Sequence, residues 1–124
     1  MSQGMGIRWS LGLNNMPTFE DFQKIDIRVG KIIAVELLEN AKYTTHKLTV
    51  DFGKEIVLKK SCARVIQYKK EELIGKLVLG VLNFPPRQIG KNLSEVLTLG
   101  IPDGKGECAL VTPDREVPLG GRLY

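Results

Sequence analysis

Polar and apolar side chains alternate between residues 24 and 35, and this pattern leaves little choice of local structure. A period of two places one set of side chains on each face of a β-strand, so the segment predicts a long strand with one buried and one solvated face. The apolar set is Ile25, Ile27, Val29, Ile32, Ile33 and Val35. Gly30 interrupts the segment, and a glycine inside a long strand indicates a bulge or a bend around a barrel corner.

Further segments have the composition of strands. We expect strands at residues 47–52, 55–60, 77–84, 96–99 and 109–111, with a turn at Gly53-Lys54 between the first two. The segment at 77–84 is nearly all apolar, as in a strand that is buried on both faces. Pro85-Pro86 end that strand because proline cannot donate a hydrogen bond to a sheet.

Two helices are also expected. Thr18 is followed three residues later by Asp21, a spacing that predicts a capped helix start with Phe19 and Phe22 on one side. A second helix is expected over residues 61–75, with Ser61 as a possible cap and Gly75 at its C-terminal end.

Three strands, a helix and two more strands suit one small architecture. We expect an all-β fold with short helices, namely a five-stranded OB-fold barrel with N- and C-terminal extensions. Other small barrels fit the same pattern. Residues 1–15 are rich in Gly, Ser and Asn and carry one charge, so we expect a tail or non-native extension there and the folded domain at 16–124.

The sequence lacks the motifs of the common catalytic and metal sites. It has one histidine and two cysteines, Cys62 and Cys108, with no Cys-x-x-Cys or His-Glu-x-x-His motif, which argues against a metal site. No glycine-rich phosphate loop and no Gly-x-Ser-x-Gly elbow is present. We therefore expect a binding module that has neither catalytic activity nor a cofactor.

Segments that would direct the chain across a membrane are also missing from the sequence. The longest apolar run, residues 77–82, is far shorter than the ~20 residues of a spanning helix. No basic stretch followed by an apolar segment and a small-residue cleavage site is found near residue 1. We expect a cytoplasmic protein that does not insert into membranes.

Positive charge is concentrated in the middle third of the chain. The formal net charge is +4 over 124 residues, but residues 54–91 alone hold nine basic and three acidic side chains, a net of +6. Lysine and arginine neutralise phosphates and release the counterions that condense on nucleic acids. The excess predicts a nucleic-acid-binding face, and a solvated lysine-rich surface is the alternative.

Four blocks of sequence carry a family resemblance. They are Lys24–Ile32, Lys47–Gly53, Asn83–Ile89 and Ser94–Leu97. Together, in this order, they resemble the tRNA-binding domain family, which includes the C-terminal appendage of methionyl-tRNA synthetases, small tRNA-binding proteins and the CsaA export chaperones. The stand-alone CsaA group is the most similar, because Asn-Phe-Pro-Pro-Arg and Ser-Glu-Val-Leu occur together. The resemblance runs from about residue 19 to residue 118.

The resemblance implies an OB fold that works as a homodimer, with the terminal extensions in the interface. Phe19 and Phe22 suit that interface because large aromatic side chains anchor protein contacts; the alternative is that they cap the bottom of a monomeric barrel. The chain departs from the family after Arg87, where Gln88 replaces a second basic residue and the loop glycine, Gly90, has moved by one position.

Nine residues are expected to contact RNA or peptide: Arg28, Lys59, Lys60, Asn83, Arg87, Ile89, Lys91, Ser94 and Glu95. Arg87 follows the rigid Pro85-Pro86 pair, so its guanidinium can bind a phosphate or stack on a base with little loss of entropy. An ion pair with Glu95 is the alternative role for this arginine. Asn83 offers both a donor and an acceptor, although asparagine at a strand end is often a turn former.

The remaining candidates supply weaker signals. Ser94 can donate to a phosphate or merely begin a strand. The lysines of the set attract phosphates without sequence preference, and each of them alone suits a solvated surface equally well. Ile89 and the nearby Leu93 lie beside basic residues and suit an extended polypeptide. Aromatic residues are few, which favours recognition of a folded RNA by its shape over stacking along a single strand.

These observations predict a non-catalytic tRNA-binding OB-fold protein of the CsaA type. The resemblance implies an export-related chaperone role, in which unfolded or precursor polypeptides are bound. The alternative is a general structure-specific tRNA-binding factor that has no chaperone activity.

Overall fold

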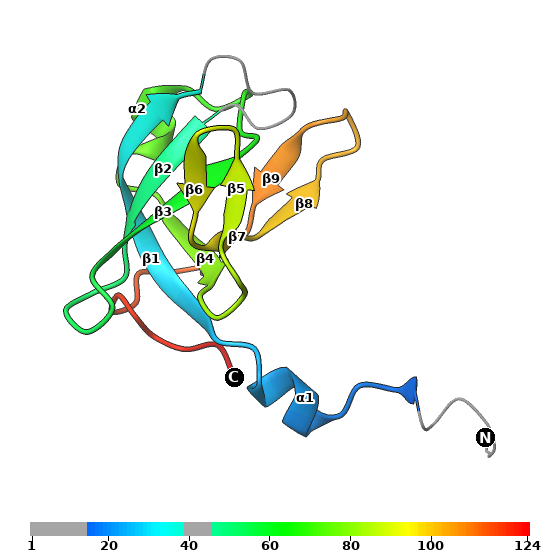
Figure 1. Cartoon of the computed structure of the whole chain (residues 1–124). Helices are drawn as coiled ribbons and strands as arrows, with labels where there is room; N and C mark the ends of the chain where they lie inside the picture. Colours follow the sequence, from blue (N-terminus) through cyan, green and yellow to red (C-terminus); the bar gives the residue numbers. More distant parts are fainter. Residues whose placement is uncertain (1–14, 39–45) are drawn as a thin grey trace.

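The computed structural model describes residues 15–38 and 46–124, and these ranges contain nine strands and two short helices (Figure 1). The strands are β1 (Ile27–Leu37), β2 (His46–Asp51), β3 (Leu58–Ala63), β4 (Leu77–Val81), β5 (Arg87–Ile89), β6 (Asn92–Ser94), β7 (Leu97–Thr98), β8 (Gly100–Pro102) and β9 (Cys108–Leu110). The helices are α1 (Phe19–Gln23) and α2 (Lys70–Leu73). Neither helix of the described ranges is long and apolar enough to cross a membrane.

Five strands form one antiparallel sheet in the order β3-β2-β1-β4-β7. The two outer strands, β3 and β7, approach each other. Glu95 lies just before β7, and its N–H donates to the carbonyl of Lys60 in β3 at 2.8 Å. The Ser61 hydroxyl donates to the carbonyl of Val96 at 2.9 Å and lies 2.6 Å from the Thr98 hydroxyl. We call this set of bonds the closing seam. It nearly closes the sheet into a barrel, which confirms the five-stranded OB fold.

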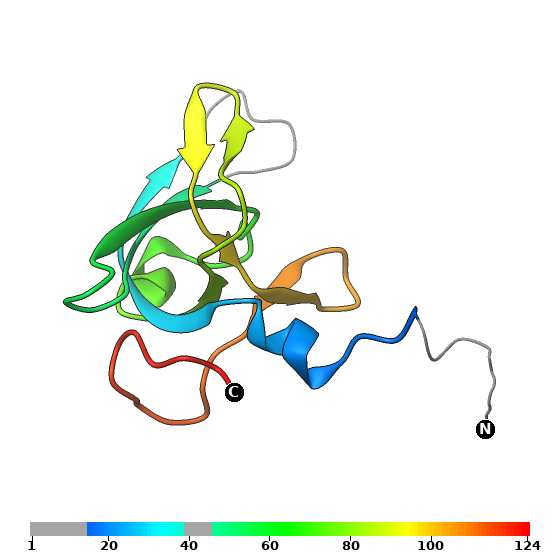
Figure 2. The ribbon, with the colours of Figure 1, turned by 60° about the horizontal axis from the view of Figure 1, so that its bottom comes forward.

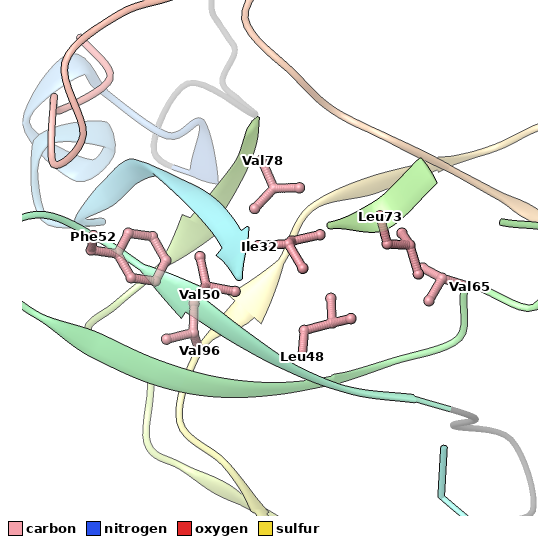
Figure 3. Close-up of a cluster of buried hydrophobic side chains, with 8 residues drawn as sticks. All are labelled: Ile32, Leu48, Val50, Phe52, Val65, Leu73, Val78 and Val96. Carbon is pink, nitrogen blue, oxygen red and sulfur yellow. The ribbon is translucent and has the colours of Figure 1, made fainter. Parts of the chain in front are cut away.

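The barrel interior is filled by apolar side chains from β1, β2 and β4, from α2 and from the loops beside them (Figure 3). They are Ile32, Leu48, Val50, Phe52, Val65, Leu73, Val78 and Val96. The alternation read from the sequence explains two of the contributing strands, because alternate residues of β1 and β2 point into this core. Helix α2 closes one end of the barrel with its single buried residue, Leu73.

Of the two interpretations of Gly30, a bulge or a bend, the bulge is wrong. The register of β1 against β2 shifts between Ile32 and Ala34, beyond Gly30. Gly30 instead marks a close approach of two strands: a Cβ atom there would lie 2.5 Å from Val50 and 2.8 Å from Phe52. Only glycine leaves room for these core side chains.

The helix expected over residues 61–75 is wrong for most of its length. The chain remains in β3 through Ala63, and α2 covers only Lys70–Leu73. Ser61 is not a cap; it is fully buried, and its hydroxyl belongs to the closing seam. These long-range bonds outweigh the local helix preference. Gly75 follows the helix as expected, and the third strand begins at Leu58, three residues later than predicted.

Two hairpins extend from the barrel (Figure 2). One is formed by β5 and β6 and the other by β8 and β9. The sequence pattern predicted β9 and β7 approximately and missed β5, β6 and β8. Each of the missed strands has three residues and contributes no apolar side chain to the core cluster, so the sequence shows no period of two there.

The two terminal segments meet at one end of the barrel (Figures 1 and 2). Helix α1 begins at Thr18 with the predicted capping box: Asp21 N–H donates to the Thr18 hydroxyl, and Thr18 N–H donates to the Asp21 carboxylate. The C-terminal segment runs beside the first half of β1. The N–H of Gly120 donates to the carbonyl of Val29 at 2.9 Å, and the N–H of Leu123 donates to the carbonyl of Ile27 at 2.9 Å.

Candidate nucleic-acid interface

The β5–β6 hairpin stands beside β3 and carries several of the predicted site residues. Arg87 pairs with Ser94 in its register, and Ile89 pairs with Asn92. The turn between them has two residues, and its first residue, Gly90, has a φ of +60°. A two-residue turn of this kind requires a positive φ, so the shifted glycine noted in the sequence lies where the hairpin needs it.

A pocket of about 380 Å³ lies between the hairpin and the barrel. We call it the hairpin pocket; its lining residues are Cys62, Phe84, Pro85, Arg87, Ser94, Glu95, Val96 and Leu97. Three of the nine predicted contact residues therefore share one cavity. The apolar walls were not predicted, because nothing in the sequence marks Phe84 or Leu97 as neighbours of Arg87.

Arg87 and Glu95 both line this pocket, yet they do not neutralise each other. Within the described residues, no ion pair joins them and the Arg87 guanidinium makes no hydrogen bond. The ion pair with Glu95, the alternative role for this arginine, is therefore not formed. Glu95 is fixed by its own contact, since its Oε1 accepts from the N–H of Lys60 at 2.9 Å. Arg87 is exposed and can reach a ligand.

Ser94 and Asn83 are occupied by backbone partners. The Ser94 hydroxyl accepts from the N–H of Cys62 at 3.0 Å and donates to a carbonyl of the closing seam. The Asn83 side chain accepts from the N–H of Asp26 at 2.9 Å and donates to the carbonyl of Lys24 at 2.7 Å. Both residues hold the framework of the site, and their contact with RNA stays a prediction.

Lysines on the outer face of the sheet flank the hairpin pocket. Lys60 Nζ donates to the Thr49 hydroxyl at 2.6 Å, and Lys47 Nζ donates to Asn92 Oδ1 at 3.3 Å, which ties β2 to the hairpin. Lys47 was not among the predicted residues. Its signal was present in the alternation of 47–52, which places Lys47 on the solvated face of the strand opposite the core residues.

Three predicted contact residues lie outside this arrangement. Lys59 is the neighbour of Lys60 on β3 and therefore points to the other face of the sheet. Arg28 forms an ion pair with Asp26 at 2.7 Å and donates to the carbonyl of Gly120, beside the C-terminal segment. Lys91 is exposed in the hairpin turn. The ninth residue, Ile89, is half-buried in β5.

The cysteine of the pocket is not a prepared nucleophile. Burial raises the pKa of the Cys62 thiol, while the charges of Lys47 and Arg87 and the hydrogen bond with Ser94 act in the opposite direction. Because burial is the largest of these effects, the thiol remains protonated at neutral pH. The pocket therefore presents hydrogen-bonding groups and apolar walls, without an activated thiol, to a ligand.

The two predicted interface aromatics lie in a second patch, at the meeting point of the chain ends. The rings of Phe19 and Phe22 are stacked with centroids 6.4 Å apart, and Phe19 is 68% exposed. A hollow of about 220 Å³ joins them to Leu123 and the fully exposed Tyr124. We call these four residues the terminal patch. Exposed apolar patches of this kind mark contact surfaces.

Comparison with known proteins gives three consistent findings. The family model described as "Putative tRNA binding domain" matches residues 27–122. A methionine–tRNA ligase of Pyrococcus horikoshii is 41% identical over 110 residues, covering 85% of this chain and 14% of the ligase. A ligase of Methanosarcina mazei is 34% identical over 105 residues and is covered to the same 14%. The chain thus spans about a seventh of the length of these curated relatives.

Solved structures of stand-alone proteins match over nearly their whole length. The CsaA chaperone protein of Picrophilus torridus is 46% identical, with a TM-score of 0.82 over 88% of this chain and 100% of that one. The chaperone CsaA of Bacillus anthracis is 36% identical, with a TM-score of 0.81 over 88% of this chain and 99% of that one.

Proposed function

This chain belongs to the tRNA-binding domain family, and from that premise we propose that it binds tRNA through the hairpin pocket and the lysines beside it. The observation that carries the proposal is the Arg87 guanidinium, which is exposed at the pocket and has no partner among the described residues, while Lys60 and Lys47 lie on the adjoining strands β3 and β2. A guanidinium without an internal partner is ready to form two parallel hydrogen bonds with a phosphate or a base. The surrounding cations supply the salt-dependent attraction to the RNA backbone.

Binding of unfractionated tRNA to the wild-type protein and to Arg87→Ala tests this proposal. We expect the wild-type affinity to fall about a hundredfold or more between 50 and 200 mM salt. The substitution should weaken binding by about 1–3 kcal/mol. Arg115→Ala is the matched control, because Arg115 is 80% exposed and, among residues 15–38 and 46–124, pairs with the adjacent Asp114 alone. Equal loss in both variants, or no complex at low salt, would overturn the proposal.

We also propose that the same site holds unfolded or precursor polypeptides, in an export-related chaperone role. The supporting observation is the apolar lining of the hairpin pocket, where Phe84 and Leu97 are 46% and 43% exposed, together with Leu93, 45% exposed, on the opposite face of β6 from Ser94. The named chaperones to which the chain is similar favour this second function. Without such activity, the protein would be a general structure-specific tRNA-binding factor.

Suppression of aggregation of a denatured client protein tests the chaperone role. Leu97→Asp should lose the suppression because it places a charge in the apolar lining. Ile101→Asp is the control, since Ile101 is also surface-exposed, at 58% against 43% for Leu97, but lies on the other hairpin. If the wild-type protein leaves aggregation unchanged, only the RNA-binding role remains.

The other parts of the proposal concern the whole protein. We propose a non-catalytic, cytoplasmic homodimer that uses no cofactor, with the folded domain at residues 16–124 and the two copies joined through the terminal patch. The support for the interface is the exposure of Phe19 and Tyr124 in one apolar surface.

A further inference from the structure

The hairpin pocket combines two charges of opposite sign with apolar walls. Arg87 offers hydrogen-bond donors, and Glu95 offers an acceptor, because only its Oε1 is used, by the N–H of Lys60. Within the described part of the chain, Glu95 Oε2 has no hydrogen-bond partner and no ion pair. A ligand that fills the pocket must therefore present donors to Glu95 and acceptors to Arg87.

The shape of the pocket restricts the ligand further. Its volume of about 380 Å³ lies at the small end of ligand sites. The remaining walls are the apolar side chains of Phe84, Pro85, Val96 and Leu97. Phe84 is 46% exposed and offers an aromatic face. A flat ring with polar edges suits such a pocket, because its faces contact apolar walls and its edges reach the two charged groups.

We propose that the hairpin pocket takes one unstacked guanine base of an RNA ligand. This inference rests on the proposed tRNA-binding function and deepens it by naming the base. The N1–H and N2–H₂ groups of guanine are adjacent donors that match the free oxygen of Glu95, and O6 and N7 are acceptors that match the guanidinium of Arg87.

The other bases satisfy this pair of groups less well. Adenine presents an unprotonated N1 acceptor to the carboxylate, and cytosine presents one amino group beside an acceptor. Uracil has a single N–H donor between two carbonyl oxygens. Each of these leaves a charged group without its hydrogen bond or places two acceptors together, which costs binding free energy.

The charges around the pocket favour RNA over a peptide as the occupant. Lys47 and Lys60 flank the site, and Lys91 is exposed in the hairpin turn. Lys47 and Lys60 suit the phosphates on either side of a bound nucleoside, and Lys91 adds positive charge at the tip of the hairpin. A peptide arginine could also donate to Glu95, but it would meet these lysines and Arg87 without any negative charge of its own.

Fluorescence anisotropy with labelled pentaribonucleotides tests the inference. The probes are four uridines around a central guanosine, adenosine or inosine, measured at low salt with the full chain. We expect the guanosine probe to bind about tenfold more tightly than the adenosine probe, which is within the range for one bidentate base contact. Inosine lacks the N2 amino group and should bind with intermediate affinity.

Glu95→Gln tests the role of the carboxylate. The amide oxygen can still accept from the N–H of Lys60, so the barrel contact is kept. The amide NH₂ group takes the place of the free oxygen, and this donor faces the N1–H donor of guanine. The preference for guanosine should fall to within about twofold of adenosine. Glu71→Gln, which removes the same charge from the exposed surface of α2, should retain the full preference. Thermal unfolding of both variants checks that they fold.

The outcomes separate this inference from the function on which it rests. If tRNA binds but the wild-type protein holds guanosine and adenosine probes equally, the guanine assignment is overturned and the tRNA-binding function stands. If neither tRNA nor any probe binds, both fail. If an arginine-containing peptide binds and Glu95→Gln abolishes that binding while the probes stay unbound, the pocket is a peptide site. The wild-type comparison of the three probes decides the question even if Glu95→Gln does not fold.

Discussion

Among single residues, Val57 adopts a backbone conformation that suits glycine better than a β-branched side chain. Its φ is +64° in the turn between β2 and β3. The turn is held by two backbone hydrogen bonds: Val57 N–H donates to Gly53 at 2.8 Å, and Phe52 N–H donates to Val57 at 3.0 Å. The Val57 side chain is 55% exposed, so burial gives it little compensation. A non-glycine residue in this region costs about 1–2 kcal/mol.

Val57→Gly should therefore stabilise the protein. We expect the free energy of unfolding to rise by about 0.5–1 kcal/mol, because relief of the left-handed strain exceeds the entropy that glycine loses on folding. Urea denaturation measures the change. Val57→Ala keeps the Cβ atom and should gain less. A loss of stability in Val57→Gly would mean that the exposed side chain contributes more than its backbone costs.

Ser61 gives a prediction of the opposite sign. Its hydroxyl is fully buried and bonds both the carbonyl of Val96 and the hydroxyl of Thr98. Ser61→Ala should lower the free energy of unfolding by about 1–3 kcal/mol, because buried polar groups lose their partner. Thr112→Ala, which removes an exposed hydroxyl that bonds the carbonyl of the adjacent Pro113, should change the free energy of unfolding by less than about 0.5 kcal/mol. Equal effects would show that the closing seam does not depend on this hydroxyl.

The sequence was only a partial guide to the charged residues of the pocket, because Arg28, Lys59 and Lys91 lie outside it, and it did not separate ligand-facing from structural polar residues. Arg87 and Glu95 were predicted as site residues, and the structure places both in the hairpin pocket. Asn83 and Ser94 were chosen for the same site, but their side chains bind backbone groups. Charged side chains are rarely buried. An amide or a hydroxyl group, in contrast, can bind either the protein backbone or a ligand, and the sequence alone does not distinguish the two.

At the level of secondary-structure elements, helix α1 depends on a titratable cap. The N–H of Thr18 donates to the Asp21 carboxylate at 2.8 Å. This hydrogen bond, followed by that with the Thr18 hydroxyl, lowers the pKa of Asp21 below its ordinary value of 3.8. A carboxylate with a lowered pKa stabilises the folded form above its ordinary pKa, and the contribution disappears as the pH falls through the lower value.

We expect α1 to remain formed at neutral and mildly acidic pH and to fray below pH 3.8. The amide signal of Thr18, followed by NMR during an acid titration, reports this because the amide loses its acceptor when Asp21 is protonated. In Asp21→Asn the titration step should be absent. A Thr18 signal that moves equally in this variant would assign the change to another group.

The elements also show where pattern reading fails. The strands at 24–35 and 47–52 were predicted because one face of each meets the core and the other meets water. The hairpin strands β5 and β6 have three residues each and contribute no apolar side chain to the core, so they leave no apolar period to detect. The predicted helix at 61–75 failed because Ser61 reads as a cap locally, while its actual partners are on a distant strand.

For the whole molecule, the terminal patch predicts the state of assembly. Phe19, Phe22, Leu123 and Tyr124 expose apolar surface where the two ends of the described chain meet. Phe19→Asp should convert the proposed homodimer into a monomer, because a buried charge in each copy lacks a partner across the interface. Sedimentation velocity over a range of concentrations measures the change. Ile101→Asp should leave the dimer intact, and a wild-type protein that sediments as a monomer would remove the proposal.

The closing seam ties the shape of the barrel to the occupancy of the hairpin pocket. Lys60 and Glu95 bond each other twice across the seam, and Glu95 is also a wall of the pocket. A molecule bound in the pocket therefore contacts the closing seam, where few backbone hydrogen bonds join the two outer strands. A ligand bound in the pocket should therefore slow hydrogen exchange at the amides of the closing seam and raise the melting temperature. Both effects should grow with the affinity of the ligand.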